Sequence, residues 1–293
     1  MAFGMLASNG SWLLAGAQEL FWARDDNRAT FAVAGGHFNS DYYGTGSAAS
    51  AGISFPLGTD AFLVFTKYLR RVWSRLYLGG LYNLMLSGAT LSAPSGAPEE
   101  LDTYFPLETS ETASGLGIAG EWDSRDNRFS ATRGFYIPLR SMLYAQFLGS
   151  TTDYGNFKLE ANWYRALHRK DLILAARAML QTSTSDTPFY LLPAVGSGPD
   201  LRGYASGRYR DYVFYATQAE LRWYFWKGLG AVVFGGIGTT TSGFDRLFEG
   251  TVLPSYGLGL RYMIDEKSRL VIRMDYGRGD EDGVFYFSVS EAF

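Results

Sequence analysis

This chain of 293 residues has no cysteine, only two histidines and only five lysines. Without cysteine it has no disulfide framework, and it offers no Cys or His cluster that could hold zinc. No apolar run reaches the roughly 18 residues that a membrane-spanning helix needs. The net charge of −3 lacks the basic excess of a nucleic-acid-binding domain, so we expect no nucleic-acid partner.

Catalytic patterns are also missing. The chain contains no G-x-S-x-G nucleophile elbow. His37 and Ser40 are the nearest approach to a hydrolase pair, but a spacing of three along a strand places them on opposite faces. We therefore expect a protein that is not an enzyme and that has no cofactor and no metal.

Glycine and aromatic residues are abundant, with 35 Gly, 20 Tyr, 21 Phe and 7 Trp. Such a composition favours strands over helices. Of the 26 basic residues five are Lys, so 21 are Arg. Arginine suits paired, partly buried positions, as in a charged lumen, better than lysine does.

The clearest strand pattern runs from Tyr212 to Phe225. Its odd positions are mostly apolar, whereas its even positions include Gln218, Glu220 and Arg222. One apolar face and one polar face are typical of a strand between lipid and a wet lumen. A similar alternation recurs over 269–277. The sequence therefore predicts an all-β fold, a transmembrane antiparallel β-barrel.

About fifteen strands are readable in the chain. Two of them, Ser47–Phe55 and Ala61–Arg71, are separated by an expected turn at 56–60, which contains Pro, Gly and Asp. The last expected strand is 284–293. Bacterial single-chain barrels have even strand numbers, so either a first strand is absent from this chain or two strands between Ala29 and Arg71 are merged into one in this count. We favour the absence.

Three spaced motifs resemble one family. The first is a loop with Leu201, Arg202, Gly203 and Tyr204. The second is a turn with Asp123, Arg125, Asp126, Asn127 and Gly134, in which Ala131 replaces a usual proline. The third is a C-terminal signature with Phe285, Phe287, Val289 and Phe293, in which Glu291 stands where the pattern prefers an apolar residue. In these motifs the chain resembles the BamA/TamA (surface-antigen) superfamily of outer-membrane barrels, from about Ser11 to Phe293.

The resemblance implies a sixteen-stranded barrel type whose signature loop folds into the lumen. It implies a periplasmic location for the 123–134 turn. In the family the loop arginine meets an acid on each of two strands. Glu220 takes the first place, but Gly236 takes the second, and Asp275 is the expected substitute. The alternative is an Arg202 that is simply solvated.

We expect residues 1–293 to form a single transmembrane β-barrel domain in a bacterial-type outer membrane. The strand pattern starts directly after Met1, with no signal peptide and no POTRA modules before it, so we expect a short family member from a trimmed precursor. Outer-membrane assembly, or polypeptide or lipid transport, is the expected function. A structural or lipid-organising oligomeric barrel and a passive porin are the alternatives. The lipid bilayer is the expected partner, with assembly machinery or further copies of the chain left open.

Overall fold

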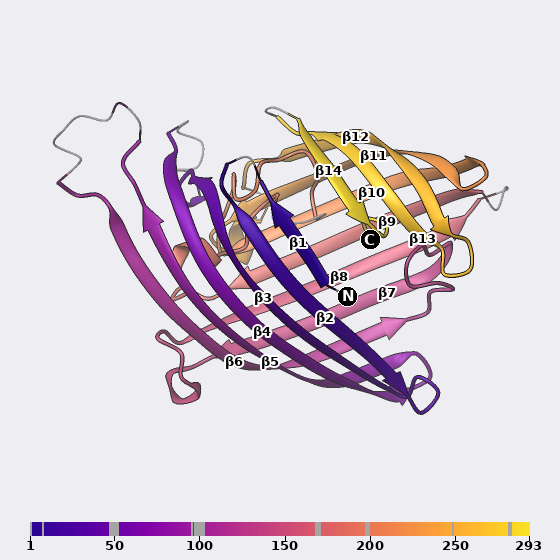
Figure 1. The fold of residues 1–293 in the computed structure, drawn as a ribbon, viewed down its shortest axis with the longest axis horizontal. Coiled ribbons are helices and arrows are strands. Elements are labelled where there is room, and N and C mark those ends of the chain that lie inside the picture. The colour runs from indigo at the N-terminus through magenta and orange to yellow at the C-terminus, as the bar shows by residue number, and fades with distance from the viewer. Residues whose placement is uncertain are drawn as a thin grey trace. The chain divides into compact units, whose positions relative to one another are not determined.

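The computed structural model of the chain describes residues 2–7, 9–46, 53–94, 96, 103–167, 171–196, 200–247, 249–280 and 283–293. These residues form one antiparallel sheet of fourteen strands, in which each strand neighbours the next one in sequence, from β1 to β14 (Figure 1). The fold class expected from the sequence is thus confirmed. The strands are β1 (Ala2–Leu6), β2 (Trp12–Trp22), β3 (Asn27–Tyr42), β4 (Phe55–Trp73), β5 (Leu76–Leu91), β6 (Leu107–Asp123), β7 (Arg133–Tyr144), β8 (Tyr154–Ala166), β9 (Leu172–Ser183), β10 (Val213–Trp226), β11 (Leu229–Thr241), β12 (Leu253–Asp265), β13 (Leu270–Arg278) and β14 (Val284–Val289).

The helical content of the described residues is small. Three 3₁₀ turns lie at Gln146–Leu148, Phe189–Leu191 and Phe244–Arg246. No helix in this part of the chain is long and apolar enough to cross a membrane.

The expected turn at 56–60 is wrong. These residues belong to β4, where Pro56 pairs with Asp41 of β3 and Leu57 pairs with both Ser40 and Leu91. Pairing on two sides outweighs the turn tendency of Pro and Gly, and Pro56 stands at the second strand position, where a missing N–H costs little. The described residues therefore contain fourteen strands, one fewer than the fifteen counted from the sequence. The expected strand Ser47–Phe55 lies largely outside the described residues.

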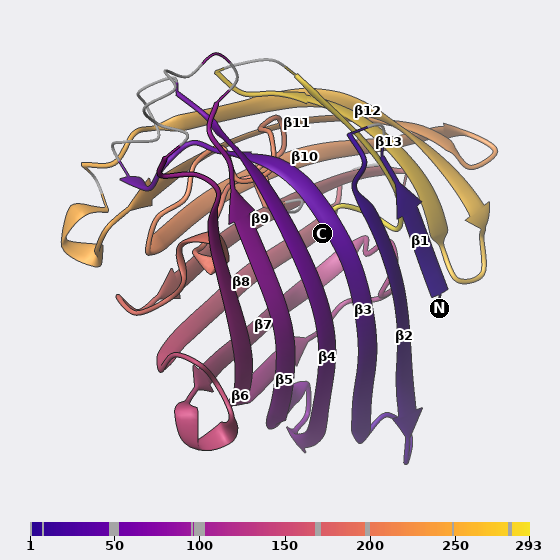
Figure 2. The ribbon, with the colours of Figure 1, turned by 60° about the vertical axis from the view of Figure 1, so that its left-hand side comes forward.

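The chain divides into two compact units, each described here by itself. Strands β2 to β5 lie side by side in the first unit (Figure 2). Strands β10 to β14 lie side by side in the second (Figure 1). The N-terminal unit comprises Met1–Gly120, Leu139–Phe157 and Thr182–Leu192, and the C-terminal unit comprises Glu121–Pro138, Lys158–Gln181 and Pro193–Phe293.

Apolar and aromatic side chains form the buried cluster of the N-terminal unit. The rings of Tyr144 and Tyr154 stack with their centroids 4.5 Å apart. A β-carbon on Gly115 would lie 2.6 Å from the ring of Tyr144, so only glycine lets this ring approach the strand. The buried members are Leu69, Tyr77, Leu81, Ala113, Ala119, Met142, Tyr144 and Tyr154.

One aromatic ring at the edge of this cluster organises nearby charges. The Arg28 guanidinium lies 3.6 Å from the centroid of the Tyr77 ring, and Arg28 Nη2 is 2.7 Å from Asp25 Oδ2. The Tyr77 hydroxyl donates to Asp25 at 2.9 Å and accepts from Arg71 Nε at 3.0 Å. These three charges are thus held around an aromatic ring and its hydroxyl as well as by ion pairs.

Strand β10 of the C-terminal unit has the alternation expected from the sequence. Gln218, Glu220 and Arg222 are buried on one side, whereas Trp223 and Phe225 on the other side are 47% and 44% exposed. We call the first side the polar face and the second the apolar face. Exposed apolar side chains continue on β12, where Leu258, Leu260 and Tyr262 alternate with buried residues. This pattern is that of a strand with lipid on one face.

Candidate functional site

The signature loop packs against the polar face of β10–β13, with Arg202 at the centre. Arg202 is fully buried, and its Nη2 lies 2.6 Å from Glu220 Oε2 while its Nη1 lies 2.7 Å from Asp275 Oδ2. Its Nε donates to Gln218 Oε1 at 3.1 Å. The guanidinium also lies 3.6 Å from the centroid of the Phe234 ring. The planar fork of arginine thus meets three acceptors and one ring at once.

The backbone around Gly203 holds the loop close to the sheet. Gly203 has φ of 110°, and a β-carbon there would lie 2.5 Å from the backbone of Arg278. Its N–H donates to the Tyr286 hydroxyl at 2.8 Å, and its carbonyl accepts from Gly279 N at 3.0 Å. Tyr204 donates its hydroxyl proton to the Pro254 carbonyl at 2.5 Å. Conformation and close contact both require glycine at 203.

Further buried charges extend from Arg202 and its partners. Arg222 Nε donates to Glu220 Oε1 at 2.6 Å, and Arg261 Nη1 lies 2.5 Å from Asp275 Oδ1. Arg261 Nε lies 2.7 Å from Glu291 Oε2, and Glu291 Oε1 accepts from the Tyr224 hydroxyl at 2.6 Å. We name these connected residues the ionic network. It consists of Arg202, Arg222, Arg261, Arg273, Glu220, Asp275 and Glu291.

Sequence reasoning missed Gln218, Glu291 and the arginines Arg222, Arg261 and Arg273 as members of this site. Gln218 pairs directly with Gly236, the position where the family pattern places an acid, and a β-carbon on Gly236 would meet the Gln218 side chain at 2.4 Å. The amide therefore occupies the space beside Arg202. The available signal was that Gln218 lies on the same face as Glu220, two residues earlier in the strand.

The 123–134 turn is built around its acidic and amide side chains. Arg125 Nε lies 3.0 Å from Asp123 Oδ1, and its guanidinium stacks 3.7 Å from the centroid of the Tyr136 ring. Asp126 accepts from Thr132 N at 2.8 Å and pairs with Arg269 at 2.8 Å. This carboxylate links the turn to the start of β13.

The remaining motif residues, Asn127 and Gly134, determine the backbone conformation of this turn. Asn127 Oδ1 accepts from Phe129 N at 2.8 Å and from Ser130 N at 2.9 Å. Gly134 has φ of 105°, and a β-carbon there would lie 2.3 Å from Ser124 O. The buried Ala131 occupies the place of the family's proline, and the turn is held by hydrogen bonds.

The C-terminal signature residues do not all share one strand. Phe285 and Phe287 are 82% and 72% exposed on β14, together with the exposed Val289. Strand β14 ends at Val289, so the expected strand 284–293 is too long. Ser290 has φ of 87°, and Phe293 packs with Tyr164, Ala131 and Ala175. The ion pairs of Glu291 fix this change of direction.

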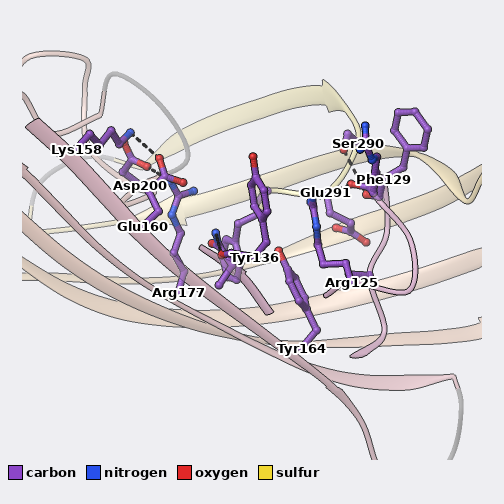
Figure 3. Close-up of a pocket in the computed structure, with 15 residues that line it drawn as sticks. Arg125, Phe129, Tyr136, Lys158, Glu160, Tyr164, Arg177, Asp200, Ser290 and Glu291 are labelled. Carbon is purple, nitrogen blue, oxygen red and sulfur yellow. Dashed lines mark hydrogen bonds and ion pairs between the residues drawn. The ribbon is translucent and has the colours of Figure 1, made fainter. Parts of the chain in front are cut away.

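A pocket of about 470 Å³ lies in the C-terminal unit beside Phe293. Figure 3 places Lys158, Glu160, Arg177 and Asp200 near one end, with Tyr136 and Tyr164 between them and Arg125. Other lining residues include Asn162, Ser290, Glu291 and Phe293.

Exposed apolar strand faces, a buried polar face and an arginine loop packed against that polar face are typical of the outer-membrane β-barrel class of protein. Within this class the chain belongs to the Omp85 superfamily, since residues 26–293 match the Omp85 superfamily domain. This agrees with the resemblance read from the three motifs. A comparison with curated proteins finds no match.

Two solved structures have a similar fold. BamA from Haemophilus ducreyi lacking POTRA domains 1–3 is 14% identical, with a TM-score of 0.63, over 96% of this chain and 62% of that chain. CdiB from Acinetobacter baumannii is 11% identical, with a TM-score of 0.57, over 96% of this chain and 50% of that chain. At these identities the likeness concerns the fold, and the chain spans less than two thirds of either relative.

Proposed function

We propose that this protein works as an outer-membrane assembly or transport barrel, with its signature loop folded inward to narrow the lumen. The observation that carries the proposal is the burial of Arg202 between Glu220, Asp275 and Gln218. A loop that is merely solvated would not need three acceptors for one guanidinium. The proposed role is non-enzymatic, and its cargo is a polypeptide or a lipid.

The docked loop favours this role over a passive porin. The sixteen-stranded barrel type that the family resemblance implies is wide enough for an aqueous channel, so low conductance is not a trivial expectation. Leu201 and Tyr204 are buried together with Arg202, which supports a loop packed as a unit. The structural or lipid-organising barrel remains the second candidate, because a fixed loop also suits a protein through which nothing passes.

Planar-bilayer recordings test the lumen part of the proposal. The protein is expected to give small, flickering conductance, which rises when Leu201–Tyr204 is deleted. The matched control is Arg246→Ala, an exposed arginine whose loss leaves the loop contacts intact. A large, steady pore in the unmodified protein would establish the porin alternative.

Reconstitution tests the assembly part. Liposomes that contain the protein should take up an unfolded outer-membrane β-barrel substrate faster than empty liposomes, or should transfer labelled lipid faster. The loop deletion should change this rate, since the loop borders the proposed path. Equal rates for protein-containing and empty liposomes in both assays would contradict the assembly and transport role and would favour the structural or lipid-organising barrel.

A further inference from the structure

The signature loop makes a second set of ion pairs, two residues before Arg202. Asp200 Oδ2 lies 3.0 Å from Lys158 Nζ on β8, and Asp200 also pairs with Arg177 on β9. Figure 3 shows these three side chains together at one end of the pocket. Gln218 on β10 holds the backbone here, since its Nε2 donates to the Asp200 carbonyl at 2.8 Å. The loop is thus attached to β8 and β9 through Asp200 as well as to β10 and β13 through Arg202.

The two attachments, which we call the Asp200 anchor and the Arg202 anchor, differ in their access to water. The side chains of Arg202, Glu220 and Asp275 have no exposed surface. Those of Asp200 and Lys158 remain 13% and 15% exposed. Dissolved ions screen a pair that they can approach, whereas a buried pair is screened much less. The Asp200 anchor is therefore the weaker of the two and the one that depends on salt.

A second carboxylate competes with Asp200 for the same two cations. Glu160 Oε1 lies 3.0 Å from Lys158 Nζ, and Glu160 Oε2 lies 2.8 Å from Arg177 Nη2. Glu160 and both cations belong to the neighbouring strands β8 and β9, whereas Asp200 belongs to the loop. When Asp200 leaves, Lys158 and Arg177 keep Glu160 as their partner. This lowers the cost of release, because an ion pair is expensive to break when it leaves a charge with no partner.

We propose that Asp200 is a positioning residue of the signature loop, whose ion pairs with Lys158 and Arg177 open and detach this part of the loop while Arg202 stays bound. Glu160 sets the strength of the Asp200 anchor by competing for its cations. The inference deepens the proposed function, and its meaning for the lumen rests on that function. The experiment below measures the attachment itself, so its result is independent of the conductance and liposome assays.

The reaction of a single thiol with a maleimide measures the release of the loop. Leu201 adjoins Asp200 and has no exposed surface, so the thiol of Leu201→Cys reacts only in molecules in which this part of the loop has moved. The chain has no cysteine of its own, so the reaction has no background. In the purified, detergent-solubilised protein the labelling rate is proportional to the fraction of molecules that are open.

Two substitutions that each remove one negative charge from the same cluster should have opposite effects. Asp200→Asn breaks the anchor and should raise the labelling rate of Leu201→Cys about tenfold, the effect of losing one charged hydrogen bond. Glu160→Gln leaves Lys158 and Arg177 to Asp200 alone and should lower the rate. A general disturbance of the packing would raise the rate in both variants.

Salt provides a second readout of the same anchor. An increase in sodium chloride from about 0.1 M to about 1 M shortens the screening length from about 10 Å to about 3 Å. This should raise the labelling rate of Leu201→Cys but leave unchanged the rate of the variant that also carries Asp200→Asn. Asp186→Asn, at an exposed acid outside the cluster, is the matched control and should behave as Leu201→Cys alone does.

Near-ultraviolet circular dichroism checks that each variant is folded. If Leu201→Cys does not fold, Val195→Cys takes its place, because Val195 is a buried residue of the same loop. A labelling rate that Asp200→Asn leaves unchanged, or that Glu160→Gln raises as much as Asp200→Asn does, overturns the proposal. A salt effect of equal size with and without Asp200→Asn also overturns it.

Discussion

The two compact units bury different kinds of side chain on similar antiparallel strands. In the N-terminal unit the cluster around Leu69, Met142 and Tyr144 is apolar and aromatic. In the C-terminal unit the ionic network centred on Arg202 and Asp275 is buried to a similar degree. Alternation along the strand is common to both units, so alternation alone does not determine what the buried face contains.

The difference lies in how each cluster responds to change. Apolar packing is non-directional, so a residue of similar volume can replace another at small cost. A buried ion pair depends on geometry, because each charge left without its partner pays the cost of desolvation. We therefore expect the C-terminal unit to tolerate far less chemical variety around the loop than the N-terminal unit tolerates in its cluster.

The largest effect is expected for Arg202→Ala. This change removes the cation that Glu220 and Asp275 share, although Arg222 and Arg261 still pair with them. Two charged hydrogen bonds are lost, each worth about 1.5–3 kcal/mol, so the expected cost is about 3–5 kcal/mol. Urea titration in detergent should report a loss of that size in the free energy of unfolding. Arg246→Ala, at an arginine that is 63% exposed, should cost less than about 1 kcal/mol. Equal losses of unfolding free energy in Arg202→Ala and Arg246→Ala would contradict the claim that the buried charge contributes more to stability than the exposed one.

A smaller and chemically different effect is expected in the N-terminal unit. Leu69→Ala opens a cavity in the apolar cluster and should cost about 2–5 kcal/mol, whereas Leu69→Met should cost less than about 1.5 kcal/mol. The same titration measures both. A Leu69→Met variant as unstable as Leu69→Ala would show that this cluster depends on exact shape as strictly as the ionic network does.

The smallest effect concerns Asp126 in the 123–134 turn, outside the strands. Burial alone would raise the pKa of Asp126, but hydrogen bonds from Thr132 and Arg269 lower it from 3.8 to about 2. Because the folded-state pKa is the lower one, the stabilisation is complete above pH 3.8 and is lost as the pH falls through about 2. Asp126→Asn should remove this loss from the profile of the free energy of unfolding against pH, measured by urea titration at each pH. The unmodified protein should retain the loss, and identical profiles for the unmodified protein and Asp126→Asn would contradict the assignment.

Much of the fold was predictable from local patterns, and part of the site was not. The alternation of Gln218, Glu220 and Arg222 identifies the buried face of β10, because the strand period is two. The 56–60 segment was misread because Pro and Gly signal turns locally, while its ladder partners on β3 and β5 are distant in sequence. Tertiary pairing overrode the local signal.

The site shows the same limit. Arg202, Glu220 and Asp275 were predicted through the family resemblance, and the structure brings all three together. The role of Glu291 depends on the turn at Ser290 and on Arg261 in another strand. A sequence pattern that reads Glu291 as a departure from an apolar strand cannot foresee that its carboxylate turns into the ionic network.

The most direct test of the docked loop is a double-mutant cycle between Arg202→Met and Glu220→Gln. The residues are 18 positions apart in sequence, and their side chains meet at 2.6 Å with no exposed surface. Contacting residues in such a network couple by about 0.5–3 kcal/mol, and burial places the expected value in the upper half of that range. Coupling of that size in the free energy of unfolding is the predicted result. Strictly additive effects would mean that Arg202 and Glu220 do not interact and that the loop is not held by this pair.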